Sequence, residues 1–199
     1  MIYFVTAQQQ AFEVEEYQLC TVEESIRMID GFTEHMVQLD TETTGLDPHI
    51  DKCLLLQFGN IEETIQIVID ATTINIRVYD EVIKNSFIIG QNLKFDEKVL
   101  YANNLMFRNC YDTMTAEQVL YQGYPNFMVG CTEDQMMRYC EYVDSVHNWE
   151  DIKKDDRKKL LYKSIPEVAD FIYEHSGVGL KALCYRYFGE EMSKEVRDL

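Results

Sequence analysis

Two acidic residues, Asp40 and Glu42, follow an apolar run in the segment VQLDTETTGLDP, residues 37 to 48. Residues two apart on a strand point to the same face, so both carboxylates are expected on one side. Neither has a basic neighbour in the sequence, and two ionised carboxylates on one face repel one another. A divalent cation such as Mg²⁺ or Mn²⁺ would offset that repulsion. In the alternative interpretation the pair lies at a solvated strand end and caps the following turn, and the pair alone does not decide between the two.

A third acid, Asp96, lies in the segment IIGQNLKFDEKVL, residues 88 to 100. A short apolar strand is followed there by Gly90, then by the amides Gln91 and Asn92, and then by Asp96 on the first turn of a predicted helix. The leucine and valine residues of this helix would hold it to the sheet. Asp96 would then face the first two acids across the end of the sheet, which favours a metal site over a solvated pair.

The elements that must position these acids alternate between strands and helices, which predicts an α/β layer structure. Short apolar or alternating runs predict strands at residues 35–40, 53–59, 64–70 and 87–90, the middle two forming a hairpin. Helical spacing, caps and stop residues predict helices at 21–31, 76–85, 93–104, 112–123, 166–177 and 179–189. Residues 124–165, rich in charge and aromatics, are interpreted as a helical insert with a solvated surface. The sequence does not show what this insert is for.

The composition of the chain limits its size class and the kinds of ligand that it can bind. The chain has 199 residues, 46 % of them hydrophobic, which predicts one domain over residues 1–199. With 35 acidic against 18 basic residues and a net charge of −17, wrapping of duplex nucleic acid by a basic face is disfavoured. A phosphate ligand would have to be met locally, through metal ions.

The same sequence gives a prediction about compartment. No run of about 18 apolar residues is present, so no membrane association is expected. The six cysteines include no CxxC pair, and the four histidines lie far from them in the sequence. This argues against a zinc site and predicts reduced thiols in a cytoplasmic protein.

The segments LDTETTGLDP and GQNLKFD resemble the first two motifs of the DEDD superfamily of 3′-5′ exonucleases. The resemblance is closest to the proofreading domain of family-A DNA polymerases, the DNA polymerase I type, and extends to ribonuclease D. It continues through YDTMTAEQVL, residues 111 to 120, and covers roughly residues 33–123 and 177–199. It implies a ribonuclease-H-like fold with a mixed five-stranded sheet flanked by helices.

The resemblance also implies roles for individual residues. It matches Asp40, Glu42 and Asp96 to three of the family's four metal-binding acids. Two Mg²⁺ or Mn²⁺ ions about 4 Å apart would activate a water and stabilise the leaving 3′ oxygen during phosphodiester hydrolysis. Asp112, the acid of the helix-opening Asp-Thr pair, is expected to support the site from behind its ligands.

The remaining matched residues would contact the substrate, expected to be a single-stranded DNA 3′ end, with RNA as the alternative because ribonuclease D shares these motifs. Thr43 and Leu46 match positions that contact the terminal nucleotide, and Gln91 and Asn92 match amides that line the same cleft. Gly45 would let the backbone approach the sugar-phosphate, although on its own it is interpreted as a simple turn residue.

The family's third motif is missing. It consists of a Tyr, or in another branch a His, followed four residues later by the fourth acid, and Asp198 comes too early to be that acid. The intact first motifs favour a fragment of a longer protein, one carrying a polymerase module, over a natural domain that has lost catalysis. The 199 residues alone are then expected to be weakly active or inactive. The form NLKFD favours the Tyr branch.

Two other functions compete with this interpretation. The chain could be an inactive nucleic-acid-binding or partner-binding module, with residues 124–165 as its contact surface. The strand ending in Asp-x-acid-x-Thr also resembles haloacid-dehalogenase-type phosphatases, in which the first Asp is a nucleophile. That family expects a second Asp at position 42, where this chain has Glu42, and it leaves GQNLKFD without a role.

Overall fold

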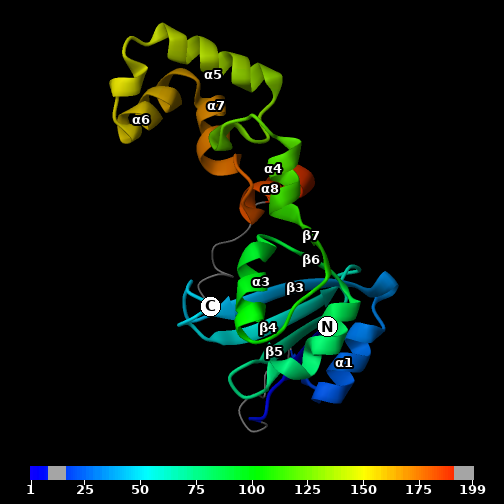
Figure 1. Cartoon of the computed structure of the whole chain (residues 1–199). Coiled ribbons are helices and arrows are strands. Elements are labelled where there is room, and N and C mark those ends of the chain that lie inside the picture. The colour runs from blue at the N-terminus through cyan, green and yellow to red at the C-terminus, as the bar shows by residue number, and fades with distance from the viewer. Residues whose placement is uncertain (9–16, 191–199) are drawn as a thin grey trace. The chain divides into compact units, whose positions relative to one another are not determined.

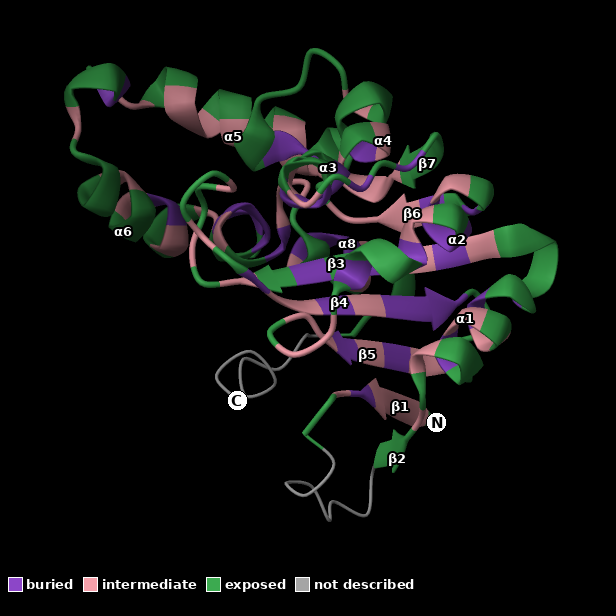
Figure 2. Cartoon of the chain, turned by 60° about the horizontal axis from the view of Figure 1, so that its bottom comes forward, coloured by how far each residue is buried: buried purple, intermediate pink, exposed green. Residues whose placement is uncertain are grey.

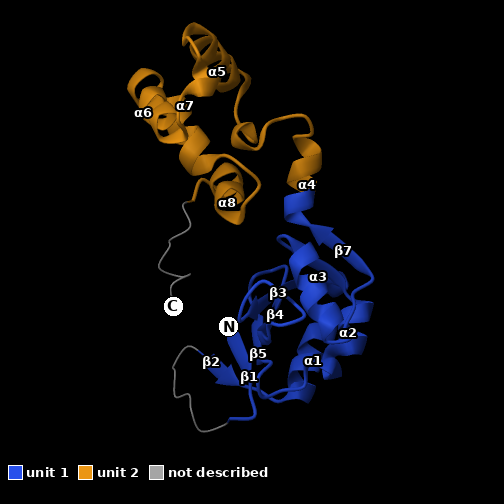
Figure 3. Ribbon diagram, turned by 60° about the vertical axis from the view of Figure 1, so that its left-hand side comes forward, with its two compact units in different colours: residues 1–115 blue, residues 116–199 orange. Residues whose placement is uncertain are grey.

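The structure, a computed structural model, describes residues 1–8 and 17–190 of the chain (Figure 1). It divides into two compact units, Met1–Thr115 and Ala116–Leu199 (Figure 3), which are described separately. Within the described ranges, every helix is too short or too polar to cross a bilayer. All six cysteines lie in these ranges, and none of them is paired in a disulfide there.

The first unit is built on a seven-stranded mixed sheet with the order β2-β1-β5-β4-β3-β6-β7. The pairs β3–β4 and β4–β5 are antiparallel, which confirms the predicted hairpin, and the other neighbours are parallel. The strands are β1 (Ile2–Val5), β2 (Tyr17–Leu19), β3 (Met36–Thr43), β4 (Cys53–Asn60), β5 (Gln66–Asp70), β6 (Phe87–Gly90) and β7 (Asn109–Asp112).

Five neighbouring strands, β5-β4-β3-β6-β7, form the expected mixed sheet, but the whole sheet has seven strands rather than five. The two further strands lie at one edge, where β1 pairs in parallel with β5 and β2 with β1. The sequence carried a signal for β1, because IYFV is a run of β-branched and aromatic residues. The three exposed residues of β2 give no such signal.

Three helices cover one face of this sheet (Figure 3): α1 (Val22–Asp30), α2 (Asp80–Asn85) and α3 (Leu93–Ala102). The predicted capping box at the start of α1 is present, with Thr21 and Glu24 as its two members. A 3₁₀ turn, Ile76–Tyr79, precedes α2 and together with it fills the predicted helix 76–85. Buried residues run along β3, β4 and β5 beneath these helices (Figure 2), and they include Val37, Leu39, Leu56, Phe58, Ile67 and Ile69.

The second unit is helical, which agrees with the interpretation of residues 124–165. The helix α4 (Thr113–Leu120) begins three residues before the boundary between the units and is followed by α5 (Glu133–Ser145), α6 (Lys154–Ser164), α7 (Pro166–Asp170) and α8 (Leu180–Phe188). The helix predicted at 166–177 is shorter than expected, because α7 gives way to a π-helical turn at Phe171–His175. Gly189, in a left-handed conformation at φ 71°, ends α8 as predicted. Asp198 lies outside the described residues.

The packing of the second unit combines an aromatic core with one buried ion pair. Trp149 packs with Leu161 and other apolar residues. Glu117, only 4 % exposed, accepts hydrogen bonds from Arg186 Nη2 at 2.7 Å and from the Tyr187 hydroxyl at 2.5 Å. This carboxylate therefore ties α4 to α8 inside the unit.

Candidate active site

Asp40 and Glu42 lie within β3, which continues to Thr43 and is longer than the strand predicted at 35–40. They stand opposite Gln57 and Leu55 of β4, and the register shifts just after Glu42. Along β3 the residues alternate in burial, with Thr41 buried and the two acids exposed. The expectation that both carboxylates share one face of the strand therefore agrees with the burial pattern.

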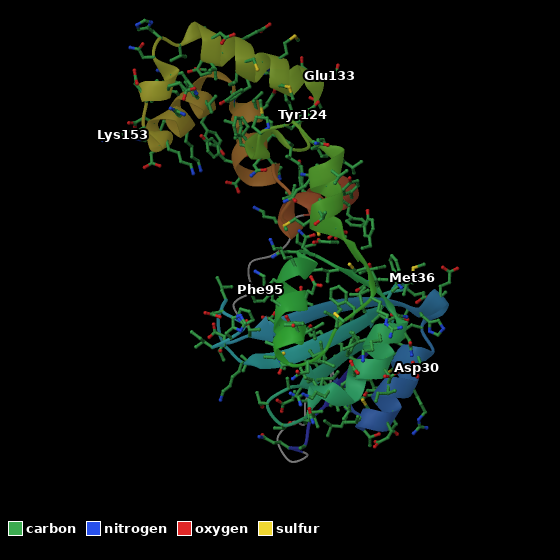
Figure 4. The ribbon with its side chains drawn as sticks, in the orientation of Figure 1. Asp30, Met36, Phe95, Tyr124, Glu133 and Lys153 are labelled. Carbon is green, nitrogen blue, oxygen red and sulfur yellow. The ribbon has the colours of Figure 1, made fainter. Side chains whose placement is uncertain are left out.

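Asp96 is buried on the first turn of α3, at 3 % exposure. Its Oδ1 accepts two hydrogen bonds from Thr41, one from the backbone N at 2.9 Å and one from Oγ1 at 2.7 Å. Phe95, labelled on α3 in Figure 4, precedes it and packs against the sheet core, which fixes the start of the helix. Burial raises the pKa of Asp96, although the Thr41 hydrogen bonds act in the opposite direction.

The electrostatics of Asp40 show that these acids interact. Its pKa rises from an ordinary 3.8 to about 6, first because the surrounding protein displaces water, and then because the carboxylates of Asp96 and Glu42 repel its charge. The ion pairs within residues 1–8 and 17–190 involve none of these three acids. Asp40 therefore lies close enough to Asp96 and Glu42 to feel their charges, and none of the three carboxylates is compensated by an ion pair among the described residues.

The chemistry of the three acids suits a hard divalent cation, which takes carboxylate oxygens as ligands. However, the three carboxylates do not all lie on the same face of β3. Thr41 holds Asp96 from one face of β3, whereas Asp40 and Glu42 point to the other, since neighbours on a strand alternate. In the part of the chain that the structure describes, no group of three or more acidic, histidine or cysteine side chains is arranged to hold one metal ion.

The loop after β3 presents the residues matched to the terminal nucleotide. Thr43 Oγ1 donates to the carbonyl of Gly45 at 2.5 Å, which turns the chain directly after the acids. A Cβ at Gly45 would lie 2.5 Å from the carboxylate of Asp51, so a larger residue there would displace this carboxylate from its hydrogen bonds with Thr44 and Asp47. Leu46, at 85 % exposure, projects from the loop into solvent.

The turn between β6 and α3 brings Gln91 and Asn92 to the start of the helix that carries Asp96. Asn92 adopts a left-handed conformation, φ 60°, and its backbone N donates to Asp112 Oδ1 at 2.9 Å. The same oxygen accepts the backbone N of Met114 at 2.9 Å. Asp112 thus holds both this turn and the start of α4. The side-chain amide oxygen of Gln91 accepts a hydrogen bond from the hydroxyl of Thr113.

Sequence reasoning missed Thr41, whose two hydrogen bonds fix the position of Asp96. Its place between two acids was visible in the sequence, and alternation on a strand puts it on the opposite face from them. What the sequence did not contain was the docking position of α3, which decides that this hydroxyl meets a carboxylate.

Comparison with known proteins identifies the family. Residues 17–197 match the 3′-5′ exonuclease domain family of DNA polymerase A. The chain belongs to that family. This confirms the resemblance drawn from the two motifs, and with the mixed sheet it confirms the ribonuclease-H-like α/β class.

Individual relatives span only part of this chain or extend well beyond it. DNA polymerase I of Aquifex aeolicus strain VF5 is 36 % identical over 102 residues, which cover 51 % of this chain and 16 % of that polymerase. Brucella melitensis NrnC is 18 % identical in sequence, with a TM-score of 0.47, and the match covers 97 % of this chain and 63 % of that one. The catalytic core of RRP6 from Trypanosoma brucei, mutant C496S, is 15 % identical with a TM-score of 0.47, over 78 % of this chain and 41 % of that one.

Proposed function

We propose that this exonuclease domain hydrolyses the terminal phosphodiester of single-stranded DNA 3′ ends, as the proofreading part of a longer polymerase. The observation that carries the proposal is the environment of Asp40: burial first, and then repulsion by the carboxylates of Asp96 and Glu42, raises its pKa to about 6. A site of carboxylates with no basic partner is suited to divalent cations and to phosphate oxygens held by them. DNA is preferred to RNA because the curated relative is a DNA polymerase.

In this proposal Asp40, Glu42 and Asp96 hold the cations, with Thr41 orienting Asp96 through its two hydrogen bonds. When bound, two Mg²⁺ or Mn²⁺ ions would supply an activated water and stabilise the leaving 3′ oxygen. A fourth acid, and the Tyr or His of the third motif, would come from outside the described residues.

The residues of the two turns would hold the 3′ end of the strand. Exposed Leu46 would wedge beneath the terminal base, while Thr43 and the backbone at Gly45 would lie along its sugar-phosphate. Gln91 and Asn92 would line the other side of the terminal nucleotide. Stacking and backbone contacts read every base alike, so we expect no sequence preference.

The test is the shortening of a 5′-labelled single-stranded DNA by the chain and by Asp40→Ala, each with Mn²⁺, Ca²⁺ or EDTA. We expect slow shortening from the 3′ end with Mn²⁺ only, and none by the variant. Electron paramagnetic resonance of Mn²⁺ supplies a second readout, because the variant should bind the ion at least tenfold more weakly. Equal Mn²⁺ affinity of the two proteins would refute the role of Asp40.

A second candidate is a catalytically inactive binding module, the alternative already considered for the sequence. It is favoured by the lack of a three-ligand metal arrangement among the described residues. It predicts that single-stranded DNA binds without a divalent cation and with equal affinity to the Asp40→Ala variant. In the exonuclease proposal, binding of the 3′ end requires the cation.

A further inference from the structure

The first unit contains a cavity beside the loop that follows the acids. Its volume is about 420 Å³, and it is lined by Pro48 and His49 of that loop, by Glu97, Lys98 and Tyr101 of α3, and by Met106. The lining combines an aromatic ring and apolar groups with the side chains of His49 and Lys98 and the acidic side chain of Glu97. The roles assigned above to Leu46 and the carboxylates make no use of this cavity.

The helix α3 has two faces with different residues. Leu93, Asp96, Val99 and Leu100 are buried against the sheet. Lys94, Glu97, Lys98 and Tyr101 are exposed and follow the spacing i, i+3, i+4 and i+7, so they form one stripe along the helix. Tyr101 is 71 % exposed, so its ring is open to solvent. We call these four residues the outer stripe of α3.

The loop between β3 and β4 connects the acids to the outer stripe. It leaves β3 directly after Glu42 and Thr43, carries Leu46 at its exposed turn, and reaches the cavity at Pro48 and His49. A strand whose terminal base lies on Leu46 and which runs along this loop would reach the cavity, which begins two residues further on at Pro48, with a nucleotide upstream of the last.

The chemistry of the cavity fits a nucleotide. The ring of Tyr101 and the side chains of Pro48 and Met106 offer apolar surface to a base, which stacks without regard to its identity. Lys98 and its neighbour on the stripe, Lys94, take part in no ion pair of the described residues. In a chain of net charge −17, the unpaired ammonium group of Lys98 beside the ring provides local attraction for a phosphate, while the carboxylate of Glu97 in the same lining acts against it.

We propose that this cavity is a subsite for a nucleotide upstream of the 3′ terminus, with its base stacked on Tyr101 and its phosphate facing Lys98. The inference rests on the proposed function, because it takes the 3′ end to lie at the acids. It predicts that the affinity of the chain for single-stranded DNA depends on the number of nucleotides in the strand. A strand of several nucleotides binds better than a mononucleotide, and the difference depends on Tyr101.

The test measures binding to the full chain by fluorescence anisotropy, with Ca²⁺ present so that the probe survives. The probes are 5′-fluorescein-labelled dT4, three forms of it that each lack one base upstream of the 3′ nucleotide, and unlabelled dTMP as a competitor. Tyr101→Ala should weaken dT4 binding by at least about fivefold, the lower end of one lost base stack. Tyr101→Phe should restore it, and Tyr17→Ala, an exposed tyrosine of β2, is the matched control.

The single-base deletions identify the contact. For the one probe that already lacks the stacked base, Tyr101→Ala should not weaken binding any further. For the other two probes, the substitution should weaken binding as much as it does for intact dT4. Competition by dTMP should be unchanged by the substitution. If Tyr101→Ala binds dT4 like the unsubstituted chain while the Asp40-dependent shortening of DNA holds, the subsite is refuted and the exonuclease proposal stands. If neither dT4 nor dTMP binds and no shortening occurs, both are refuted.

Discussion

Replacing Asp40 by Asn should stabilise the first unit when no divalent cation is present. The pKa of Asp40 rises from 3.8 in an unconstrained carboxyl to about 6 in the folded chain, so the folded state binds the proton more tightly than the unfolded state. Stability is then lost as the pH rises between these two values, because the ionised form is penalised only when folded. A shift of this size corresponds to about 3 kcal/mol at pH 7. Because the Asp40 side chain is exposed on one side, screening by water reduces this to about 1 to 2 kcal/mol.

Hydrogen exchange of peptides that cover β3 measures this effect locally, in EDTA and across pH 4 to 8. The Asp40→Asn variant should exchange like the unsubstituted chain near pH 4 and about 5- to 30-fold more slowly at pH 7.5, after correction for intrinsic rates. Peptides of the second unit, such as those covering α5, serve as the internal control. An Asp40→Asn variant that is protected no better than the unsubstituted chain at any pH, or whose advantage over it is larger at pH 4 than at pH 7.5, would contradict the electrostatic account.

Three further predictions use other parts of the chain. Mn²⁺ at 100 times its dissociation constant should stabilise β3 by about 2.7 kcal/mol in the same exchange assay, and should not do so in Asp40→Asn. Glu117→Ala should lower the free energy of unfolding of the second unit by about 3 to 5 kcal/mol, because it leaves the buried guanidinium of Arg186 without its carboxylate partner. Urea unfolding followed by the fluorescence of Trp149 measures this change. An unchanged urea midpoint would count against a stabilising role of the buried pair. Gly90→Ala should lower the free energy of unfolding by about 1 to 3 kcal/mol, and with it the melting temperature, because a Cβ there would lie 2.8 Å from the carbonyl oxygen of Leu39. An unchanged melting temperature would show that the sheet adjusts to the added methyl group.

The alternation of apolar runs and caps predicted most of the first unit. The strands 53–59 and 87–90 and the helix that begins at Leu93 were found within a residue or so, because each is set by local spacing. The short edge strand β2 was not predicted, since its three residues are exposed and their pairing depends on β1. Similarly, β7 was missed because Asn109–Asp112 has no alternating pattern of its own.

For the site, the sequence predicted which residue types would meet but not how they would be oriented. The motifs place Asp40 and Asp96 at the same end of the sheet, and the raised pKa of Asp40 is consistent with that neighbourhood. The role of Thr41 depends on how α3 docks, and the cavity beside Tyr101 depends on where the β3–β4 loop closes. Both are tertiary features, which local spacing does not encode. The metal and nucleotide roles of the site residues remain predictions.

The order of the strands also affects how the first unit is assembled. β3, β4 and β5 follow one another and pair antiparallel, so their contacts close short loops. The hydrogen bond from Thr41 to Asp96, by contrast, joins residues 55 positions apart. Contacts near in sequence form earlier because closing a short loop costs less entropy. The hairpins therefore form while Asp40 and Glu42 are still far from Asp96, and the electrostatic cost of the acidic site falls on a single late step, the docking of α3, which neutralising Asp96 would accelerate.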